Sequence, residues 1–326
     1  MFRIALIALV FALACGDDSN PTTDTGPGTD AAIDAPGVDA PGVDAPGIDA
    51  PGVDAPRIDA RADTFVELVG GEWSLAGSSE GYVCVRHTVT ETMFISQFRP
   101  VAPLGTHHTV LTYSPTATRP DGTEPCAAFT NAANMIYGSG VGTELLEFPE
   151  GVAIRLEPGN QLLLNLHLFN TDGSRLEGYS AIEVVLMDEA DVVHEAEVLL
   201  AGAEFFSIPE RSSGHEINGR CTMRGDVNVF AVMPHMHQFG TFMHVTADRG
   251  GEITTLHEDR YSFDDQAYTT FDAFPMANGD RIRVLCRYDN PTADPVGWGD
   301  STLAEMCYAG VYRYPRLASG GITCTN

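Results

Sequence analysis

Glycine and proline divide residues 65–326 into short runs rich in valine, isoleucine, threonine, phenylalanine and tyrosine. Runs of this kind are typical of β-strands, and no stretch keeps the helical apolar period long enough to predict a helix. The clearest runs are Met93 to Phe98, Val152 to Leu156, Leu162 to Phe169, Ile182 to Leu186, Val227 to Val232, Arg281 to Tyr288 and Ala309 to Tyr314. We therefore predict an all-β fold built from antiparallel β-sandwiches.

This β-rich region is roughly 260 residues long, which suits one large or two medium domains. Glycine, proline, serine and glutamate cluster around Ala201 to Ser213, after a complete series of predicted strands. We place a domain boundary there and predict two sandwiches, residues 64–205 and residues 206–326.

The first residues have the composition of an export signal. Arg3 precedes an unbroken apolar run, Ile4 to Ala14, which is too short to span a bilayer. Ala14 directly before Cys15 resembles a bacterial lipoprotein cleavage site, although Ala12 stands where leucine is usual. We predict a lipoprotein-type signal peptide over residues 1–15 with lipidation at Cys15, and an exported protein on the periplasmic or cell-surface side. An ordinary export signal is the alternative.

Residues 16–63 form a low-complexity segment. The pentapeptide Asp-Ala-Pro-Gly-Val or a close variant recurs, so that an aspartate follows every five residues from Asp34 to Asp59. Proline, glycine and like charges without large apolar side chains cannot form a core. We predict a disordered linker that tethers the folded part to the membrane through the lipid anchor only.

The chain is strongly acidic, with a net charge of −27 and no lysine. Residues 17–63 hold eleven aspartates and two arginines, which account for −9 of this charge. No basic patch with interleaved aromatic residues is present, so we expect no nucleic-acid partner. The acidity is typical of a solvated surface.

The cysteines fit an oxidising compartment. Without Cys15, six of the seven remain, an even number suited to three disulfides: Cys84, Cys126, Cys221, Cys286, Cys307 and Cys324. Two precede the predicted boundary and four follow it, so Cys84 and Cys126 would join within the first domain. No Cys-x-x-Cys motif occurs, which argues against a cysteine zinc site.

Several histidines are candidate metal ligands. On an extended strand His235 and His237 would project to the same side, where two imidazoles can share one metal ion. The adjacent pair His107 and His108 could do so only at a strand end or where the strand is twisted. His167 shares a predicted strand face with Asn165. Each of these histidines, taken alone, is equally compatible with a surface or core position.

Met306 completes a second set of ligand types. Three histidines in one set, and two histidines plus a thioether in the other, fit the ligand preference of copper better than that of zinc or magnesium. Methionine in an apolar strand is otherwise normal core filler.

In this order along the chain, the motifs resemble the copper type II, ascorbate-dependent monooxygenases, the family of dopamine β-monooxygenase and peptidylglycine α-hydroxylating monooxygenase. The resemblance covers nearly all of residues 80–326. Its motifs are the His107-His108 pair, the single His167, His-x-His-x-x-Gly from His235 to Gly240, Glu305-Met306-Cys307, Tyr314-Pro315, Tyr261 to Gln266, Asn278 to Asp280 and Arg287 to Asn290.

The resemblance implies two jelly-roll-like sandwiches side by side, with a solvent-filled cleft between two separated coppers. It implies an electron-transfer copper on His107, His108 and His167, and a catalytic copper on His235, His237 and Met306 where O2 and substrate meet. It also implies the disulfides Cys84–Cys126, Cys221–Cys324 and Cys286–Cys307.

The expected function is copper-dependent hydroxylation of an activated C–H bond, with two coppers per chain and ascorbate or another one-electron reductant as co-substrate. Met233 and Gly310 stand where the peptide-amidating member grips a substrate carboxylate with arginine and tyrosine, so a peptidylglycine substrate is not expected. We expect a monomer acting on an uncharged or differently held small molecule. The alternative is a non-catalytic, copper-binding or sequestering exported lipoprotein.

Overall fold

Short runs of β-formers give strands throughout the described part of the chain. The computed structural model describes residues 64–326 except 129, 300, 302, 318–322 and 326. The regular elements in this part are β-strands and one short 3₁₀ helix, η1 (Glu189–Asp191), so the all-β prediction is confirmed. All seven runs named above lie in strands. The predicted signal peptide, Cys15 and the linker lie outside the described residues.

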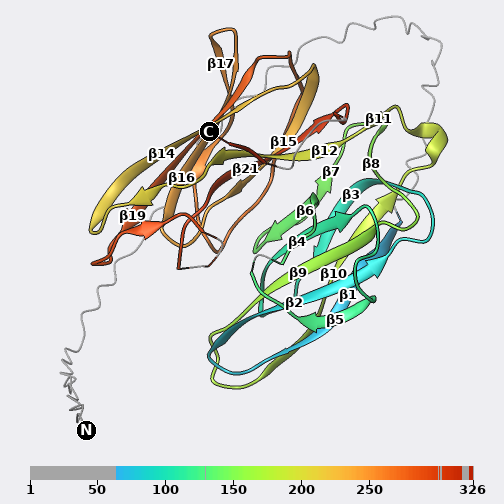
Figure 1. Cartoon of the computed structure of the whole chain (residues 1–326), viewed down its shortest axis with the longest axis horizontal. Helices are drawn as coiled ribbons and strands as arrows, with labels where there is room; N and C mark the ends of the chain where they lie inside the picture. The colour runs from blue at the N-terminus through green and yellow to red at the C-terminus, as the bar shows by residue number, and fades with distance from the viewer. Residues whose placement is uncertain (1–63, 129, 300, 302, 318–322, 326) are drawn as a thin grey trace, which may run out of the picture. The chain divides into compact units, whose positions relative to one another are not determined.

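Two sheets, here the N-terminal sheets, form from the first half of this region (Figure 1). One has the order β1-β10-β3-β8-β11, with β7 beside β3. Its strands are β1 (Phe65–Leu75), β3 (Met93–Val101), β7 (Leu146–Glu147), β8 (Val152–Leu156), β10 (Leu176–Leu186) and β11 (His194–Glu195). The other has the order β5-β2-β9-β4-β6. Its strands are β2 (Ser79–Thr88), β4 (Thr106–Ser114), β5 (Gly122–Pro125), β6 (Asn134–Gly140) and β9 (Gln161–Asn170).

The strand β9 shows how the sequence fills this core. Its even-numbered leucines, Leu162 to Leu168, are all buried and belong to one apolar cluster with Ile95, Phe98 and Ile182 of the other sheet. Because side chains alternate along a strand, the opposite face of β9 carries Asn165 and His167, which are also buried. A strand that is buried on both faces therefore holds polar groups that must find partners.

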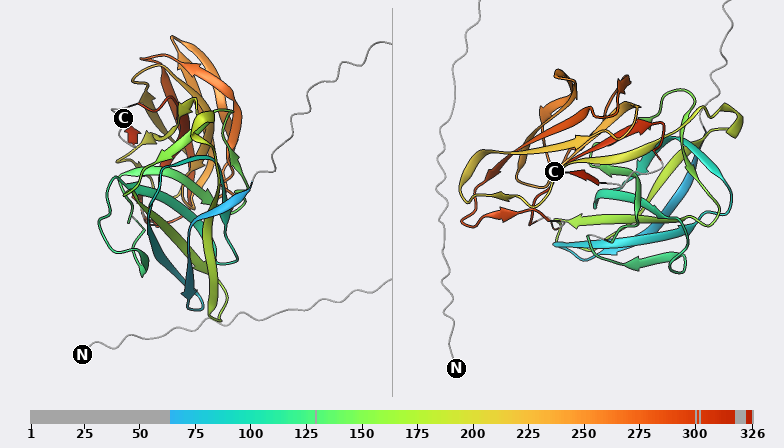
Figure 2. Two further views of the ribbon diagram at one scale, coloured as in Figure 1. Left: turned by 90° about the vertical axis from the view of Figure 1, so that its right-hand side faces the viewer. Right: turned by 45° about the horizontal axis from the view of Figure 1, so that its top comes forward.

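Three further sheets, here the C-terminal sheets, form from the remaining strands (Figures 1 and 2). Their orders are β18-β15-β21-β12-β22, β14-β19-β16-β17 and β13-β20. The strands are β12 (Glu197–Ala203), β13 (Ser207–Ile208), β14 (Ser212–Thr222), β15 (Val227–His235), β16 (Gly240–Arg249), β17 (Glu252–Arg260), β18 (Thr269–Met276), β19 (Arg281–Asn290), β20 (Val296–Gly297), β21 (Cys307–Tyr314) and β22 (Thr323–Thr325). β12 precedes residue 206, where the second sandwich was predicted to begin, yet it pairs with β21 and β22.

The N-terminal and C-terminal sheets share buried contacts within one compact unit, residues 60–326. Phe230 and Tyr312 of the C-terminal sheets belong to the apolar cluster of the N-terminal sheets. The Tyr268 hydroxyl donates a 2.6 Å hydrogen bond to the Gly138 carbonyl, and Tyr312 donates to the Ile136 carbonyl at 3.3 Å. These contacts fix β6 against β21, on either side of the cavity described below.

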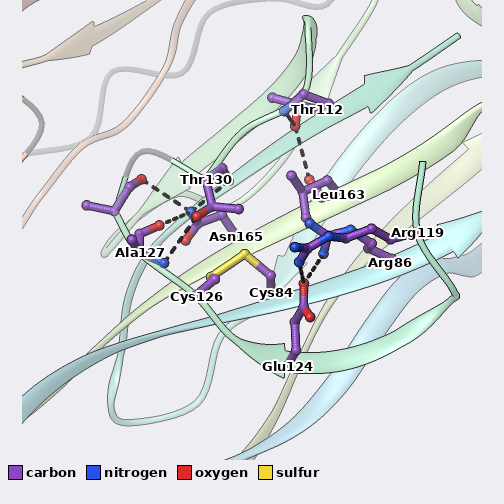
Figure 3. The surroundings of a disulfide bond; sticks show 12 residues. Cys84, Arg86, Thr112, Arg119, Glu124, Cys126, Ala127, Thr130, Leu163 and Asn165 are labelled. Carbon is purple, nitrogen blue, oxygen red and sulfur yellow. Dashed lines mark hydrogen bonds and ion pairs between the residues drawn. A yellow bond between two sulfur atoms is a disulfide. The ribbon is translucent and has the colours of Figure 1, made fainter. Parts of the chain in front are cut away.

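Three disulfides join Cys84 to Cys126, Cys221 to Cys324 and Cys286 to Cys307, the pairing that the resemblance implies. Figure 3 shows the first of them, beside the Asn165 amide. Nδ2 of Asn165 donates to the carbonyls of Ala127, Ala128 and Thr130 at 3.0–3.2 Å. The disulfide and this amide together hold the segment that follows Cys126. Among the described residues, no helix has the length and apolar character needed to cross a membrane.

Candidate metal centre

His107 and His108 lie near the start of β4, where the pairing with β9 is irregular. Thr106 pairs with Leu168 and His108 pairs with His167, so His107 is an extra residue on β4. Such a bulge breaks the strict alternation of side chains and turns neighbouring residues toward one point. The sequence predicts such a distortion if both histidines are to share one ligand site.

The Nδ1 atoms of His107, His108 and His167 converge. The Nδ1 of His108 lies 3.3 Å from that of His107 and 3.2 Å from that of His167. One ligand atom from each of the three residues lies within 4.8 Å of the other two. Nitrogens bound at about 2.0 Å to one ion are separated by similar distances, and imidazole nitrogen suits copper, zinc, iron and nickel. The donor set therefore fits a metal ion.

Burial keeps these imidazoles neutral, the form that binds metal. Burial lowers the pKa of His107. The pKa of His108 lies well below its usual range because of burial and the neighbouring histidines. Burial and His107 lower the pKa of His167, an effect that Glu80 opposes.

The second predicted set lies at the end of β15. His235 is the last residue of that strand, and His237 lies in the turn that follows it. The prediction that both project from one extended strand is therefore wrong for His237. Their ring centroids are still 5.4 Å apart, with the ring planes at 86°. Met306, directly before β21, lines the same cavity as these two histidines.

The Nδ1 atoms of both residues have hydrogen-bond partners. Nδ1 of His235 lies 3.1 Å from Oε1 of Gln266, and Nδ1 of His237 lies 2.9 Å from the Ala304 carbonyl. Since both partners are acceptors, each Nδ1 carries the proton and each Nε2 has its lone pair available. Burial lowers the pKa of His237, which favours this neutral form.

Glu305 is a fully buried carboxylate behind the second set. It accepts hydrogen bonds from the backbone N–H groups of His237 at 2.9 Å, Phe239 at 2.7 Å and Met306 at 3.3 Å. Burial raises the pKa of Glu305 to about 7, and the three N–H donors oppose this shift. The hydroxyl of Tyr288, in β19, donates a 2.6 Å hydrogen bond to the Met306 carbonyl, which ties Met306 to β19.

A cavity of about 340 Å³ joins the two sets. His108, His235, His237 and Met306 all line it. The ring centroids of His108 and His235 are 6.1 Å apart. The two sets are thus neighbours across one cavity, whereas the resemblance implied well-separated sites.

The cavity wall is mainly apolar. Met233 and Gly310 lie opposite each other on β15 and β21, and both line the cavity. Glu204 also lines it and accepts a 2.8 Å hydrogen bond from the Tyr308 hydroxyl. Among the described lining residues none is an arginine. Asn165, on the same face of β9 as His167, anchors the segment containing Ala128, another lining residue.

Part of the chain matches a known protein family. Residues 194–325 match the family profile of the copper type II ascorbate-dependent monooxygenase, C-terminal domain. This match supports that family for the part of the chain that carries the second set. The matched segment contains His235, His237 and Met306 and begins at β11.

A human relative supports the same family. The DBH-like monooxygenase protein 2 of Homo sapiens is 26% identical over 241 residues, which are 65% of this chain and 47% of that protein. The chain thus spans about half the length of this curated relative. A structure of the infectious bursal disease virus Gx strain was also compared with this chain. The alignment covers 79% of this chain and 76% of the viral chain, at 10% identity and a TM-score of 0.17. That likeness carries no argument.

Three residues that position the histidines were missed in the sequence: Glu80, Gln266 and Glu305. Gln266 and Glu305 lie inside motifs that carried the family resemblance, but their partners are distant in sequence. Glu80 carries no motif, and its bond to His167 spans 87 residues. The spacing of Glu80 and Tyr82 was a weak signal, because residues two apart on a strand share a face. Tyr82 stacks on His167, so Glu80 lies on the same side.

Proposed function

We propose that the chain is a copper-dependent monooxygenase that hydroxylates an activated C–H bond of a small molecule. It would use O2 and a one-electron donor such as ascorbate, with two coppers per chain. The observation that carries this proposal is the pair of histidine sets on one cavity, one with three converging Nδ1 atoms and the other beside Met306. A chain of this family with only one such set would have no separate electron store.

His107, His108 and His167 would hold the electron-transfer copper. His235, His237 and Met306 would hold the copper where O2 and substrate meet, and imidazole with thioether favours Cu(I) there. Bound copper supplies one-electron transfer and oxygen activation. The overall reaction takes R–H, O2, two electrons and two protons to R–OH and water, with both electrons coming from the external donor.

The protein's own contribution is orientation and exclusion of water. Gln266 and the Ala304 carbonyl fix the two imidazoles with the proton on Nδ1, and Glu305 fixes the turn that carries His237. Apolar lining residues such as Leu200 and Met233 would hold the substrate carbon near the second set. A preorganised, water-poor cavity limits side reactions.

The lining supports a small, largely apolar substrate. Met233 and Gly310 provide no charge-assisted grip for a carboxylate, and no described lining residue is an arginine. These features disfavour a peptide carboxylate as the substrate group.

Three disulfides are consistent with an exported protein. We extend the proposal to a lipid anchor at Cys15 on a bacterial membrane. Incorporation of labelled fatty acid into the wild type, but not into Cys15→Ser, would test this anchor.

The test of activity is O2 uptake by the copper-loaded chain with ascorbate, in the presence of a panel of small apolar molecules. We expect substrate-dependent uptake and one ¹⁸O atom from ¹⁸O₂ in each hydroxylated product. Met306→Ala should abolish product formation, while His215→Ala, in the outer strand β14 and outside both sets, should not. Reduction of bound copper by ascorbate without substrate-dependent uptake for any molecule would instead indicate a copper-binding or sequestering protein.

A further inference from the structure

Glu80 makes a direct contact with a candidate ligand of the first set. Its Oε1 lies 2.7 Å from Nε2 of His167. The His167 side chain is 1% exposed and that of Glu80 is 36% exposed. Tyr82, between them on β2, stacks on the His167 ring at 4.7 Å and donates a 3.2 Å hydrogen bond to the same carboxylate. The Glu80 carboxylate, Tyr82 and His167 thus form one connected group.

This contact selects the tautomer of His167. A carboxylate is an acceptor, so Nε2 of His167 must carry the proton and donate it. The lone pair is then on Nδ1, which is the atom that lies 3.2 Å from Nδ1 of His108. Carboxylate partners of this kind orient metal-binding histidines and raise the basicity of the ligand nitrogen.

Two hydrogen bonds of the second set join its imidazoles to uncharged groups. The partner of His235 is the neutral Gln266 amide, and that of His237 is the Ala304 backbone carbonyl. Glu305 accepts hydrogen bonds from backbone N–H groups of that set. The bond between Glu80 and His167 differs from the bonds of Gln266 and Ala304, because it joins a charged group to a ligand histidine.

Asp264 offers a comparison within the first set. Its Oδ1 lies 3.4 Å from Nε2 of His107, and its side chain is 86% exposed. That nitrogen is buried and makes no hydrogen bond among the described residues. Asp264 raises the pKa of His107, as Glu80 raises that of His167, but the more exposed carboxylate is screened more strongly by water.

We propose that Glu80 is a positioning residue of the first set, which fixes the His167 tautomer and adds a negative charge that favours Cu(II) over Cu(I) there. This inference rests on the proposed function, because it requires copper at the first set. A nearby negative charge stabilises the more highly charged ion. With copper bound, the Glu80 charge would favour loss of an electron from the first set toward the second, and the external one-electron donor would replace that electron.

The experiment compares Glu80→Gln, Glu80→Ala and Asp264→Asn in the full chain. The readouts are the midpoint potential of each copper, followed by the Cu(II) electron paramagnetic resonance spectrum, and the copper affinity of each set. Glu80→Gln keeps an acceptor oxygen but loses the charge, so we expect both coppers to bind and only the first-set potential to become more positive. Glu80→Ala should weaken first-set affinity by about 10–100-fold. Asp264→Asn should change the first-set potential and affinity less than Glu80→Gln does, because the Asp264 side chain is 86% exposed.

Each other outcome overturns the inference. An unchanged first-set potential in Glu80→Gln, or an equal shift at both coppers, would show that Glu80 does not tune this set. An Asp264→Asn shift as large as that of Glu80→Gln would show a general charge effect. These results would leave the proposed function standing. Absence of first-set copper in the wild type would instead overturn both proposals.

Discussion

The backbone N–H of His237 donates a 2.9 Å hydrogen bond to Oε2 of Glu305. The other oxygen of this buried carboxylate accepts from the Phe239 N–H at 2.7 Å. The turn after β15 is thus tied to the residue directly before Met306, although His237 and Glu305 are 68 residues apart. One carboxylate positions two of the three proposed ligands of the second set.

Replacement of Glu305 by alanine should destabilise the fold and the second set together. Three backbone N–H groups would lose their acceptor, and buried unsatisfied donors cost about 1–3 kcal/mol each, so we expect the free energy of unfolding to fall by at least about 3 kcal/mol. Urea denaturation measures this loss, and copper titration should show weaker binding at the second set only. Glu216→Ala is the control, because its ion pair with Arg287 is exposed and should contribute less than about 1 kcal/mol. Equal effects of the two variants would contradict the assigned role.

Gln266 should control the orientation of His235. Gln266→Met keeps the length of the side chain but removes the acceptor for Nδ1, so we expect second-set copper affinity to fall by about 10–100-fold. Gln266→Glu retains an acceptor and should bind copper more tightly than Gln266→Met. Copper competition with a chelator of known affinity measures both. If Gln266→Met binds copper as the wild type does, the hydrogen bond to His235 has no positioning role.

The Cys286–Cys307 disulfide closes a loop of sequence separation 21 and joins β19 to the residue after Met306. Loop-closure entropy predicts that its removal in Cys286→Ala/Cys307→Ala costs about 3 kcal/mol. Second-set copper affinity should fall as well, because the backbone at Met306 is released. Cys84→Ala/Cys126→Ala is the matched control: it should also lower stability while leaving second-set affinity unchanged. A fall in that affinity in both double variants would indicate a global rather than a local effect.

Asp248 should make stability depend on acid pH. Hydrogen bonds from Arg283 and from the Gly251 N–H hold the pKa of this 5%-exposed carboxyl below its ordinary value of 3.8. A carboxyl whose pKa is depressed by folding adds stability that is fully present above pH 3.8. This stability is lost as the pH falls through the lower pKa of the folded state. Asp248→Asn should therefore have a lower urea midpoint than the wild type at pH 7, and the gap should narrow below about pH 4. Asp259→Asn, on an exposed part of β17, should match the wild type at pH 7.

Local patterns predicted the strands and much of the first histidine set. The alternating run in β9 correctly placed Asn165 and His167 on one face, opposite four buried leucines. The sequence also showed that His107 and His108 needed a distorted strand, and the structure supplies a bulge at that point. These features depend on neighbours within a few residues, which periodicity can show.

The turn at His237 and the partners of the ligand histidines could not be predicted in the same way. β15 ends at His235 because the following segment is held by Glu305, a long-range contact without a local signal. The bond between Glu80 and His167 likewise depends on the pairing of β2 with β9. Strand order and register arise from tertiary packing, so short sequence segments do not predict which residues meet across neighbouring strands.

Copper stoichiometry tests directly whether each of the two histidine sets binds one copper. It should be measured on the purified chain as wild type, His107→Ala and Met306→Ala, with His244→Ala, on β16, as a control outside both sets. We expect two coppers per chain in the wild type and in His244→Ala, and one in His107→Ala. Met306→Ala should bind copper more weakly at a single site. Fewer than one copper per wild-type chain, or the same stoichiometry in all four proteins, would contradict the assignment of the two sets.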